Sequence, residues 1–544
     1  MSMTMKLRSR LVTLLLFILV LAGICSAATI TGTVAGVDGK PFQGAFVEAQ
    51  NSKTKITVIV LSGSRGEYAI ENLPQGEYRV QLRAVGFKAQ PIQGVKLQGS
   101  QKVTQDFALE KSKIEWRDIS LYQATELWPA ARGKDIILGR CSSCHAFQSR
   151  MASVVRDEEG WRDRVEYMRK SMRISTEFSD DDAAEVALYL TKLFGPNPVL
   201  PPSPADMPGF QKTVRQFSGE AMNIVYVEYD MPGPSRMPFS AAPDKNGQVW
   251  IPNFGSVNKI TRLNPDTGEM QDFTVPHVGT ARIHSAIPAS DGSVWIAEQQ
   301  SNKLARWDPV TKEITEFPGP DAEATIVDRY GLRHKEPAQK HTLRLDSKGG
   351  VWASGVPLTK FDPVTKKYTR YDDAAFVYDV KPDKGGNVWF TDLIGHTIGK
   401  VDAATGKVMK WAPPTPSSLP RRVEVGKDGI IWFGEYNAGK LGRFDPETRK
   451  FEEFVLPGPD PSPYGLGVAA DGAIWYDSHN QDTIGRFDPK TGKITEYPFP
   501  HPEICIREFF PDKQGRMWYG SSPNNKVGYF YLTPKRNGST ASSN

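Results

Sequence analysis

Cys141, Cys144 and His145 have the spacing most specific for chemistry in this chain, within the pentapeptide Cys-Ser-Ser-Cys-His. In c-type haem attachment, two thiols add to the haem vinyl groups and the next residue brings its imidazole to the iron. The spacing therefore predicts one covalent haem c, with thioether links at Cys141 and Cys144 and His145 as proximal ligand. A zinc or redox Cys-x-x-Cys site is the alternative, but no second pair of ligands lies nearby.

The second axial ligand of such an iron is less clearly marked. The chain has eight histidines, and only His145 lies in this part of the sequence. The local thioethers are Met151, Met168 and Met172. Met168 and Met172 share a helical spacing with Trp161, so they can equally be core residues. A methionine ligand would raise the reduction potential, which suits electron transfer.

The first 28 residues are expected to be an export signal. Lys6, Arg8 and Arg10 precede an apolar run at 11–24, which is short for a membrane span, and small residues follow it. Cleavage near Ala27 or Ala28 would release a periplasmic or secreted protein that does not span a membrane. Loss of the signal lowers the net charge from +5 to +2. That charge is too small to indicate nucleic acid as a partner.

Residues 29–110 alternate apolar and polar side chains between turn signals such as Asp38-Gly39, as in a β domain. The stretches "GTVAGVDGKPFQGAFVEA" and "GEYAIENLPQGEYRVQLRAVGF" resemble the carboxypeptidase regulatory-like domain. That resemblance implies a small Ig-like β-sandwich with a structural or docking role.

Residues 111–197 change to a helical period. Ser179, with Asp182 three residues later, predicts a helix start, and Gly195 is expected to end that helix. The order of Cys-x-x-Cys-His, Trp, Val, Met and Tyr-Leu along this stretch resembles small class I cytochrome c domains. The resemblance implies a small all-α haem module and favours Met168 as the distal ligand, with Met172 second. A Pro-rich linker, 198–222, follows.

Residues 223–535 are built from repeats, each marked by a Gly, one variable residue, one apolar residue and then a tryptophan. The tryptophans are Trp250, Trp295, Trp352, Trp389, Trp432, Trp475 and Trp518. A period of about 43 residues made of short strands is typical of propeller blades, so seven blades are predicted. The last unit lacks an outer strand, and we expect 223–232 to supply it, which removes an exposed edge. The tail, 536–544, is expected to be disordered.

The blade register indicates which side chains face the central channel. Eleven residues before the tryptophans stand Phe239, His284, His341, Tyr378, Arg421, Tyr464 and Arg507. Three residues after them stand Asn253, Glu298, Gly355, Asp392, Glu435, Ser478 and Ser521. Strands inside a propeller are normally apolar, so both sets are predicted to line the mouth of the channel. A solvated rim without a ligand is the alternative.

The blades "GGNVWFTDLIGHTIGKVD" and "DGIIWFGEYNAGKLGRFDP" resemble the streptogramin B (virginiamycin B) lyase family. The resemblance implies a magnesium-assisted elimination that opens a cyclic depsipeptide. Its working set is a histidine in one blade and Glu-x-His with a later glutamate in the next. Here His284 and Glu298 match in one blade, but Arg282 stands at the preceding acid position. A magnesium site needs convergent carboxylates, which Arg282 opposes.

Together these patterns predict a multidomain, mainly β protein that transfers electrons to or from a periplasmic donor or acceptor. The propeller is expected to bind a small molecule or the redox partner. If it is catalytic, His284 and His341 are the acid/base candidates, Glu298 and Glu435 candidate bases or metal ligands, and Arg421 an anion clamp. The alternatives are a lyase-like elimination enzyme and a non-catalytic binding protein.

Overall fold

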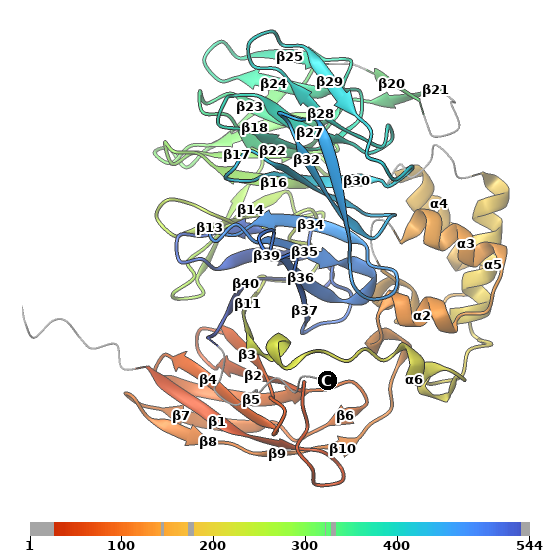
Figure 1. Ribbon diagram of the computed structural model, residues 1–544, viewed down its shortest axis with the longest axis vertical. Coiled ribbons are helices and arrows are strands. Elements are labelled where there is room, and N and C mark those ends of the chain that lie inside the picture. Colours follow the sequence, from red (N-terminus) through yellow and green to blue (C-terminus); the bar gives the residue numbers. More distant parts are fainter. Residues whose placement is uncertain (1–26, 143–145, 172–178, 321–322, 328–332, 535–544) are drawn as a thin grey trace, which may run out of the picture.

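The computed structural model describes residues 27–142, 146–171, 179–320, 323–327 and 333–534. It is mainly β, with an Ig-like N-terminal domain, a helical segment and a propeller (Figure 1). No helix within the described ranges is long and apolar enough to cross a membrane.

The N-terminal domain is a β-sandwich whose two sheets enclose one apolar core. One sheet has the order β4-β1-β8 with β9 beside β1, and the other runs β3-β2-β5-β7. The strands are β1 (Ala28–Ala35), β2 (Phe46–Asn51), β3 (Thr57–Leu61), β4 (Glu67–Leu73), β5 (Gly76–Arg83), β6 (Phe87–Lys88), β7 (Ile92–Leu97), β8 (Lys102–Thr104), β9 (Phe107–Ala108) and β10 (Glu110–Lys111). Alternation puts Ile30, Val47, Ile70 and Val80 inside, all fully buried.

The helical segment packs around Trp161, Trp128 and Phe147. Its elements are η1 (Trp116–Asp118), α2 (Leu121–Leu127), α3 (Arg132–Ile136), the π-helices η2 (Ile137–Cys141) and η3 (Gln148–Ala152), α4 (Glu158–Ser171) and α5 (Asp180–Phe194). The predicted start of α5 is confirmed, because the Ser179 side chain accepts the Asp182 N–H at 3.0 Å. The linker adds η5 (Pro204–Asp206), α6 (Phe210–Thr213) and η6 (Gly219–Asn223).

Apart from the hairpin β20–β21, the remaining strands within the described ranges group into seven four-stranded antiparallel blades. Blade 1 is β12 (Ala242–Pro243), β13 (Val249–Pro252), β14 (Lys259–Leu263) and β15 (Met270–Thr274). Blade 2 is β16 (Ile283–Pro288), β17 (Val294–Glu298), β18 (Lys303–Trp307) and β19 (Ile314–Pro318). Blade 3 is β22 (Gln339–Leu345), β23 (Val351–Val356), β24 (Leu358–Asp362) and β25 (Lys367–Tyr371). The hairpin β20 (Glu323–Val327) and β21 (Arg333–Pro337) lies between blades 2 and 3, which explains their longer spacing.

Blade 4 is β26 (Val377–Pro382), β27 (Val388–Asp392), β28 (Thr397–Val401) and β29 (Val408–Trp411). Blade 5 is β30 (Pro420–Val425), β31 (Ile431–Glu435), β32 (Lys440–Asp445) and β33 (Lys450–Val455). Blade 6 is β34 (Pro463–Val468), β35 (Ile474–Ser478), β36 (Thr483–Phe487) and β37 (Ile494–Pro498), with η7 (His479–Gln481) inside it. Blade 7 is β38 (Phe510–Pro511), β39 (Met517–Ser521), β40 (Lys526–Leu532) and β11 (Ile224–Asp230).

The repeated tryptophans are blade anchors. The indole N–H of Trp250 donates to Asp244 at 3.1 Å, and that of Trp352 donates to Asp346 at 2.9 Å. Trp389 and Trp518 make the same bond to the aspartate six residues earlier. In these four blades, a turn aspartate accepts the N–H of the buried indole, so that donor is satisfied.

The predicted closure of the ring is confirmed. β11 pairs with β40 along its full length, from Ile224 opposite Leu532 to Asp230 opposite Lys526. The other edge of β11 pairs with β3 of the sandwich, with Tyr226 opposite Ile59. Blade 7 and one sandwich sheet are therefore a single eight-stranded sheet, and the edge strand is covered on both sides.

Candidate functional site

The residues eleven positions before the blade tryptophans form a closed ring of contacts. The ring centroids of Phe239 and His284 are 5.1 Å apart, those of His284 and His341 3.7 Å, and those of His341 and Tyr378 4.6 Å. The Arg421 guanidinium lies 5.3 Å from the Tyr378 ring and 4.2 Å from the Tyr464 ring. The Arg507 guanidinium closes the ring, 5.1 Å from Tyr464 and 4.1 Å from Phe239. These contacts agree with the predicted channel register. They bring together three of the five candidate catalytic residues.

The two histidines of this ring are held in the neutral form. Burial, with His341 and Arg422 nearby, holds the pKa of His284 well below its ordinary value. Burial and Arg422 do the same to the pKa of His341. The Nδ1 atom of His341 lies 2.8 Å from the Tyr378 carbonyl oxygen, whereas neither ring nitrogen of His284 has a hydrogen-bond partner among the residues that the structure describes. His341 can thus be oriented as a base, and His284 offers unused donor and acceptor positions.

A tyrosine and arginine cluster joins this ring to the helical segment. Tyr436 lies with its ring 4.2 Å from the Arg421 guanidinium and donates its hydroxyl to the carbonyl oxygen of Ser142 at 3.2 Å. Ser142 follows Cys141, so the pentapeptide that carries the haem motif contacts the channel residues directly. Tyr436 stands four residues after its blade tryptophan, a register that the sequence prediction missed.

Further hydrogen bonds dock the helical segment on the propeller. Gln148 donates to Asp482 at 3.2 Å, and the Ser149 N–H donates to Glu503 at 2.8 Å. Figure 1 shows the segment lying along one side of the propeller, beyond β30. Both bonds start from η3, the π-helix that follows the pentapeptide 141–145 in the sequence.

Cys141 and Met168 line the same pocket in the helical segment, which encloses about 50 Å³. Its walls also include Met151, Trp161 and Val165, so it is largely apolar. Cys144, His145 and Met172 lie outside the described residues.

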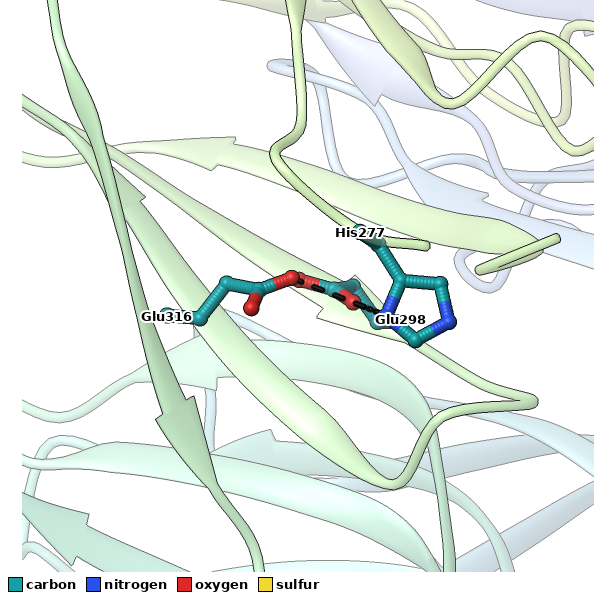
Figure 2. Close-up of side chains that lie close together, drawn as sticks. All are labelled: His277, Glu298 and Glu316. Atoms are coloured by element: carbon teal, nitrogen blue, oxygen red, sulfur yellow. Dashed lines mark ion pairs between the residues drawn. The ribbon is translucent and has the colours of Figure 1, made fainter. Parts of the chain in front are cut away.

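Glu298 and Glu435 stand in the second predicted register and are not among the contacts of the ring that contains His284. Both are fully buried. Glu298 accepts a hydrogen bond from Ser301 at 2.7 Å and lies beside Glu316 and His277 (Figure 2). Successive side chains along a strand point to opposite faces, so Glu435 and Tyr436 point in different directions. It is Tyr436 that contacts Arg421 of the ring.

The group of His277, Glu298 and Glu316 was tested as a magnesium site. The Nδ1 atom of His277 lies 3.8 Å from a carboxylate oxygen of each glutamate (Figure 2). However, the Lys303 ammonium lies 2.6 Å from Glu316 and already balances its charge. Magnesium also prefers an octahedron of oxygens, which this set does not supply. The residues do not fit magnesium, and no catalytic step is derived through it.

Blade 5 repeats this arrangement with a different neighbour. Lys440 lies 2.7 Å from Glu453, beside Glu435, and Thr415 donates to Glu453 where blade 2 has His277. Burial raises the pKa of Glu435 to about 7, as it does for Glu298. The polar positions at the end of the second strand are therefore blade-internal contacts.

The raised pKa of Glu435 predicts a pH-dependent loss of stability. The folded protein binds this proton more tightly than the unfolded chain, so the contribution of Glu435 to stability falls as pH rises from about 4.5 to about 7. Glu435→Gln should raise the free energy of unfolding by about 1–3 kcal/mol at pH 8 and have little effect at pH 4. Urea unfolding at both pH values measures this.

Glu453→Gln is the matched control for that prediction. Although burial opposes it, the bonds from Lys440 and Thr415 hold the pKa of Glu453 below its ordinary value. Its replacement should therefore lower stability at pH 8. Equal effects of the two substitutions at pH 8 would show that Glu435 is not buried as described.

Two family models match parts of the chain. Residues 29–110 match the carboxypeptidase regulatory-like domain, and residues 363–535 match the virginiamycin B lyase family. The chain contains a virginiamycin B lyase-like propeller. Both matched ranges leave the helical segment uncovered, so nothing in them supports its resemblance to class I cytochromes c.

One solved structure supports the fold of the lyase-like propeller, and a second is similar to it in sequence. A streptogramin B lyase structure is 23% identical with a TM-score of 0.51, and the match covers 58% of this chain and 100% of that chain. The virginiamycin B lyase of Staphylococcus aureus, as a selenomethionine derivative, is 21% identical with a TM-score of 0.49, covering 57% of this chain and 100% of that one. No curated protein matches the chain.

At two positions near His284 and His341, this propeller has other residues in place of the acids that the lyase resemblance implies. Arg282 lies over the Phe254 ring at 5.4 Å and donates to the Tyr167 hydroxyl at 3.3 Å, so it serves the contact with the helical segment. In blade 3, Gly355 stands where the family has its later glutamate. His284 and His341 thus meet without a carboxylate between them.

Proposed function

We propose that this protein is an exported c-type haem protein that transfers single electrons in the periplasm. The observation that carries the proposal is the Cys-x-x-Cys-His motif, whose first cysteine, Cys141, lines an apolar pocket shared with Met168. The lyase-like propeller binds a small molecule or a redox partner next to that motif.

The residues of the pocket fit a haem. Cys141 and Cys144 would form the thioether links, and His145 and Met168 would bind the iron. Bound there, the haem supplies an iron that takes up and releases one electron. The apolar walls suit a macrocycle, and the guanidinium groups of Arg150 and Arg164, which also line the pocket, suit its two carboxylates.

The contact between Tyr436 and Ser142 supports a role for the propeller in this function. It joins the haem motif to the ring of His284, His341 and Arg421 without an intervening domain. Arg421, which belongs to that ring, can stabilise an anionic ligand.

A redox titration of the purified holoprotein tests electron transfer. We expect a reversible one-electron change of the haem spectrum and exchange with small periplasmic electron carriers. A haem that stays oxidised under strong reductants, or one that exchanges electrons with no carrier, would contradict the proposal.

The family match of residues 363–535 favours a second candidate, an elimination enzyme that opens a cyclic depsipeptide. The absence of a fitting carboxylate set beside His284 weighs against it. The test is a depsipeptide-opening assay on the wild type and on Cys141→Ala, which cannot complete the haem attachment. Equal turnover by both would establish the lyase and make the haem incidental. Binding of the depsipeptide without turnover would instead indicate a non-catalytic binding protein.

A further inference from the structure

The channel contains buried hydrogen-bond donors that no described protein group satisfies. Both ring nitrogens of His284 lack a partner, and its side chain is 1% exposed. Nε and Nη2 of Arg422 also lack partners, and this residue is 1% exposed. Leaving such groups unsatisfied costs about 1–3 kcal/mol each, so native proteins rarely do so without a water or ion.

The acidic groups near these donors are already shared. Glu508 lies 2.6 Å from Arg344 and 3.8 Å from Arg422, so one carboxylate serves two guanidinium groups. Asp379 lies 3.4 Å from Arg422 and also accepts the Val423 N–H. Despite burial, Arg344 and Arg422 hold the pKa of Glu508 below its ordinary value.

The unsatisfied donors belong to one connected group. Arg422 donates to Thr342 at 2.7 Å, and the Thr342 hydroxyl lies 3.1 Å from Nδ1 of His341. His341 stacks on His284 at 3.7 Å. The charge of Arg422 also acts on both histidines, because it is among the causes that keep them neutral.

The chemistry of this group selects the kind of ligand. A metal cation is excluded because Arg422, Arg507 and Arg344 all oppose positive charge at His284. An apolar ligand would leave the donors unsatisfied. An oxyanion accepts from an imidazole N–H and a guanidinium together, so it would satisfy both kinds of donor.

We propose that the channel of the propeller binds one small oxyanion, a carboxylate or an inorganic anion such as phosphate, through His284 and Arg422. This goes beyond the proposed electron transfer and does not depend on it, because the site is made by propeller residues alone. The proposed oxyanion is a different class of ligand from the depsipeptide that the lyase resemblance implies.

Calorimetric titration of the full-length protein with inorganic phosphate and, separately, with acetate tests the proposal. We expect saturable binding at one site per chain for at least one of them. Preference for acetate would identify the ligand as an organic acid, and preference for phosphate as an inorganic or phosphorylated anion. Saturable binding of neither anion would overturn the proposal.

His284→Phe separates a ligand site from a structural role. Phe239 occupies the equivalent position in blade 1, so an aromatic ring fits this register. The variant should bind the anion about 10- to 100-fold more weakly, because a hydrogen bond to a charged group is lost. The ligand-free Tm should rise by a few degrees, because two unsatisfied nitrogens are removed. Unchanged affinity, or a lower Tm, would overturn the assignment of His284.

Arg422→Gln and Arg443→Gln complete the test. The first should weaken binding at least as much as His284→Phe. Arg443 pairs with Glu452 at 2.9 Å on the outside of blade 5, so its replacement removes one arginine without touching the channel. Equal loss of anion binding in both variants would show that only general charge is involved, which contradicts a site.

Discussion

Met168→Ala should lower the reduction potential of the haem by about a tenth of a volt, within the span of about 0.8 V that axial ligands control. A thioether stabilises the reduced iron, and its loss lets water or another donor take the position. Met168 is the candidate because its side chain lines the pocket that Cys141 also lines. Spectroelectrochemical titration of wild type and variant measures the difference.

Met151→Leu is the control for that substitution. Met151 lines the same pocket and is 8% exposed, so its replacement changes the packing of the walls without removing the proposed ligand. Its potential should stay close to that of the wild type. If Met172→Ala shifts the potential and Met168→Ala does not, the assignment of the distal ligand is wrong.

Tyr226→Ala should lower the free energy of unfolding by about 3–5 kcal/mol, the cost of deleting a large buried aromatic side chain. Tyr226 is fully buried in β11, between β40 of blade 7 and β3 of the sandwich. Its hydroxyl donates to the Pro498 carbonyl oxygen at 2.7 Å. Because β11 belongs to both domains, sandwich and propeller should unfold together at lower urea concentration.

Tyr226→Phe separates packing from the hydrogen bond. It keeps the ring against Phe499 and loses only the hydroxyl, so the expected cost is about 1 kcal/mol. If Tyr226→Ala lowers the stability of the propeller and leaves the sandwich transition unchanged, the two domains are not coupled through the shared sheet.

The blade count and the closing strand could be predicted because both depend on local patterns. Each blade carries its tryptophan at the same place in the repeat, and in four blades an aspartate six residues earlier accepts the indole N–H, so the signal recurs in sequence. The outer strand 224–230 resembles its counterparts in other blades, and only one edge of the ring was open. Residues around Ser179 carry a helix cap that needs no tertiary context.

The site itself could be predicted only in part. The ring that contains His284 follows from the blade register. The same register did not predict the blade contacts of Glu298 or the channel contact of Tyr436. Both stand near the end of a second strand, and a shift of one residue decides whether a side chain faces the blade or the channel. The contact of Tyr436 with Ser142 joins residues 294 positions apart, and no periodicity encodes how two domains dock.

The pairing of β11 with β3, which joins blade 7 and the sandwich in one sheet, also could not be predicted from the sequence. The resemblance implied a structural or docking role for the N-terminal domain, without any pairing of its strands with the propeller. An edge strand such as β3 can pair with any exposed partner, and pairing through main-chain groups leaves little trace in side-chain type.

The central claim is that Cys141 and Cys144 carry a covalent haem, and intact-mass spectrometry with absorption spectroscopy tests it most directly. The protein should be produced in a host competent for haem ligation, beside a Cys141→Ser and Cys144→Ser double variant. We expect the wild type to carry the mass of one haem, with a Soret band that survives denaturation, and the double variant to carry neither. A wild type with the mass of the bare polypeptide and no Soret band would contradict the proposed function.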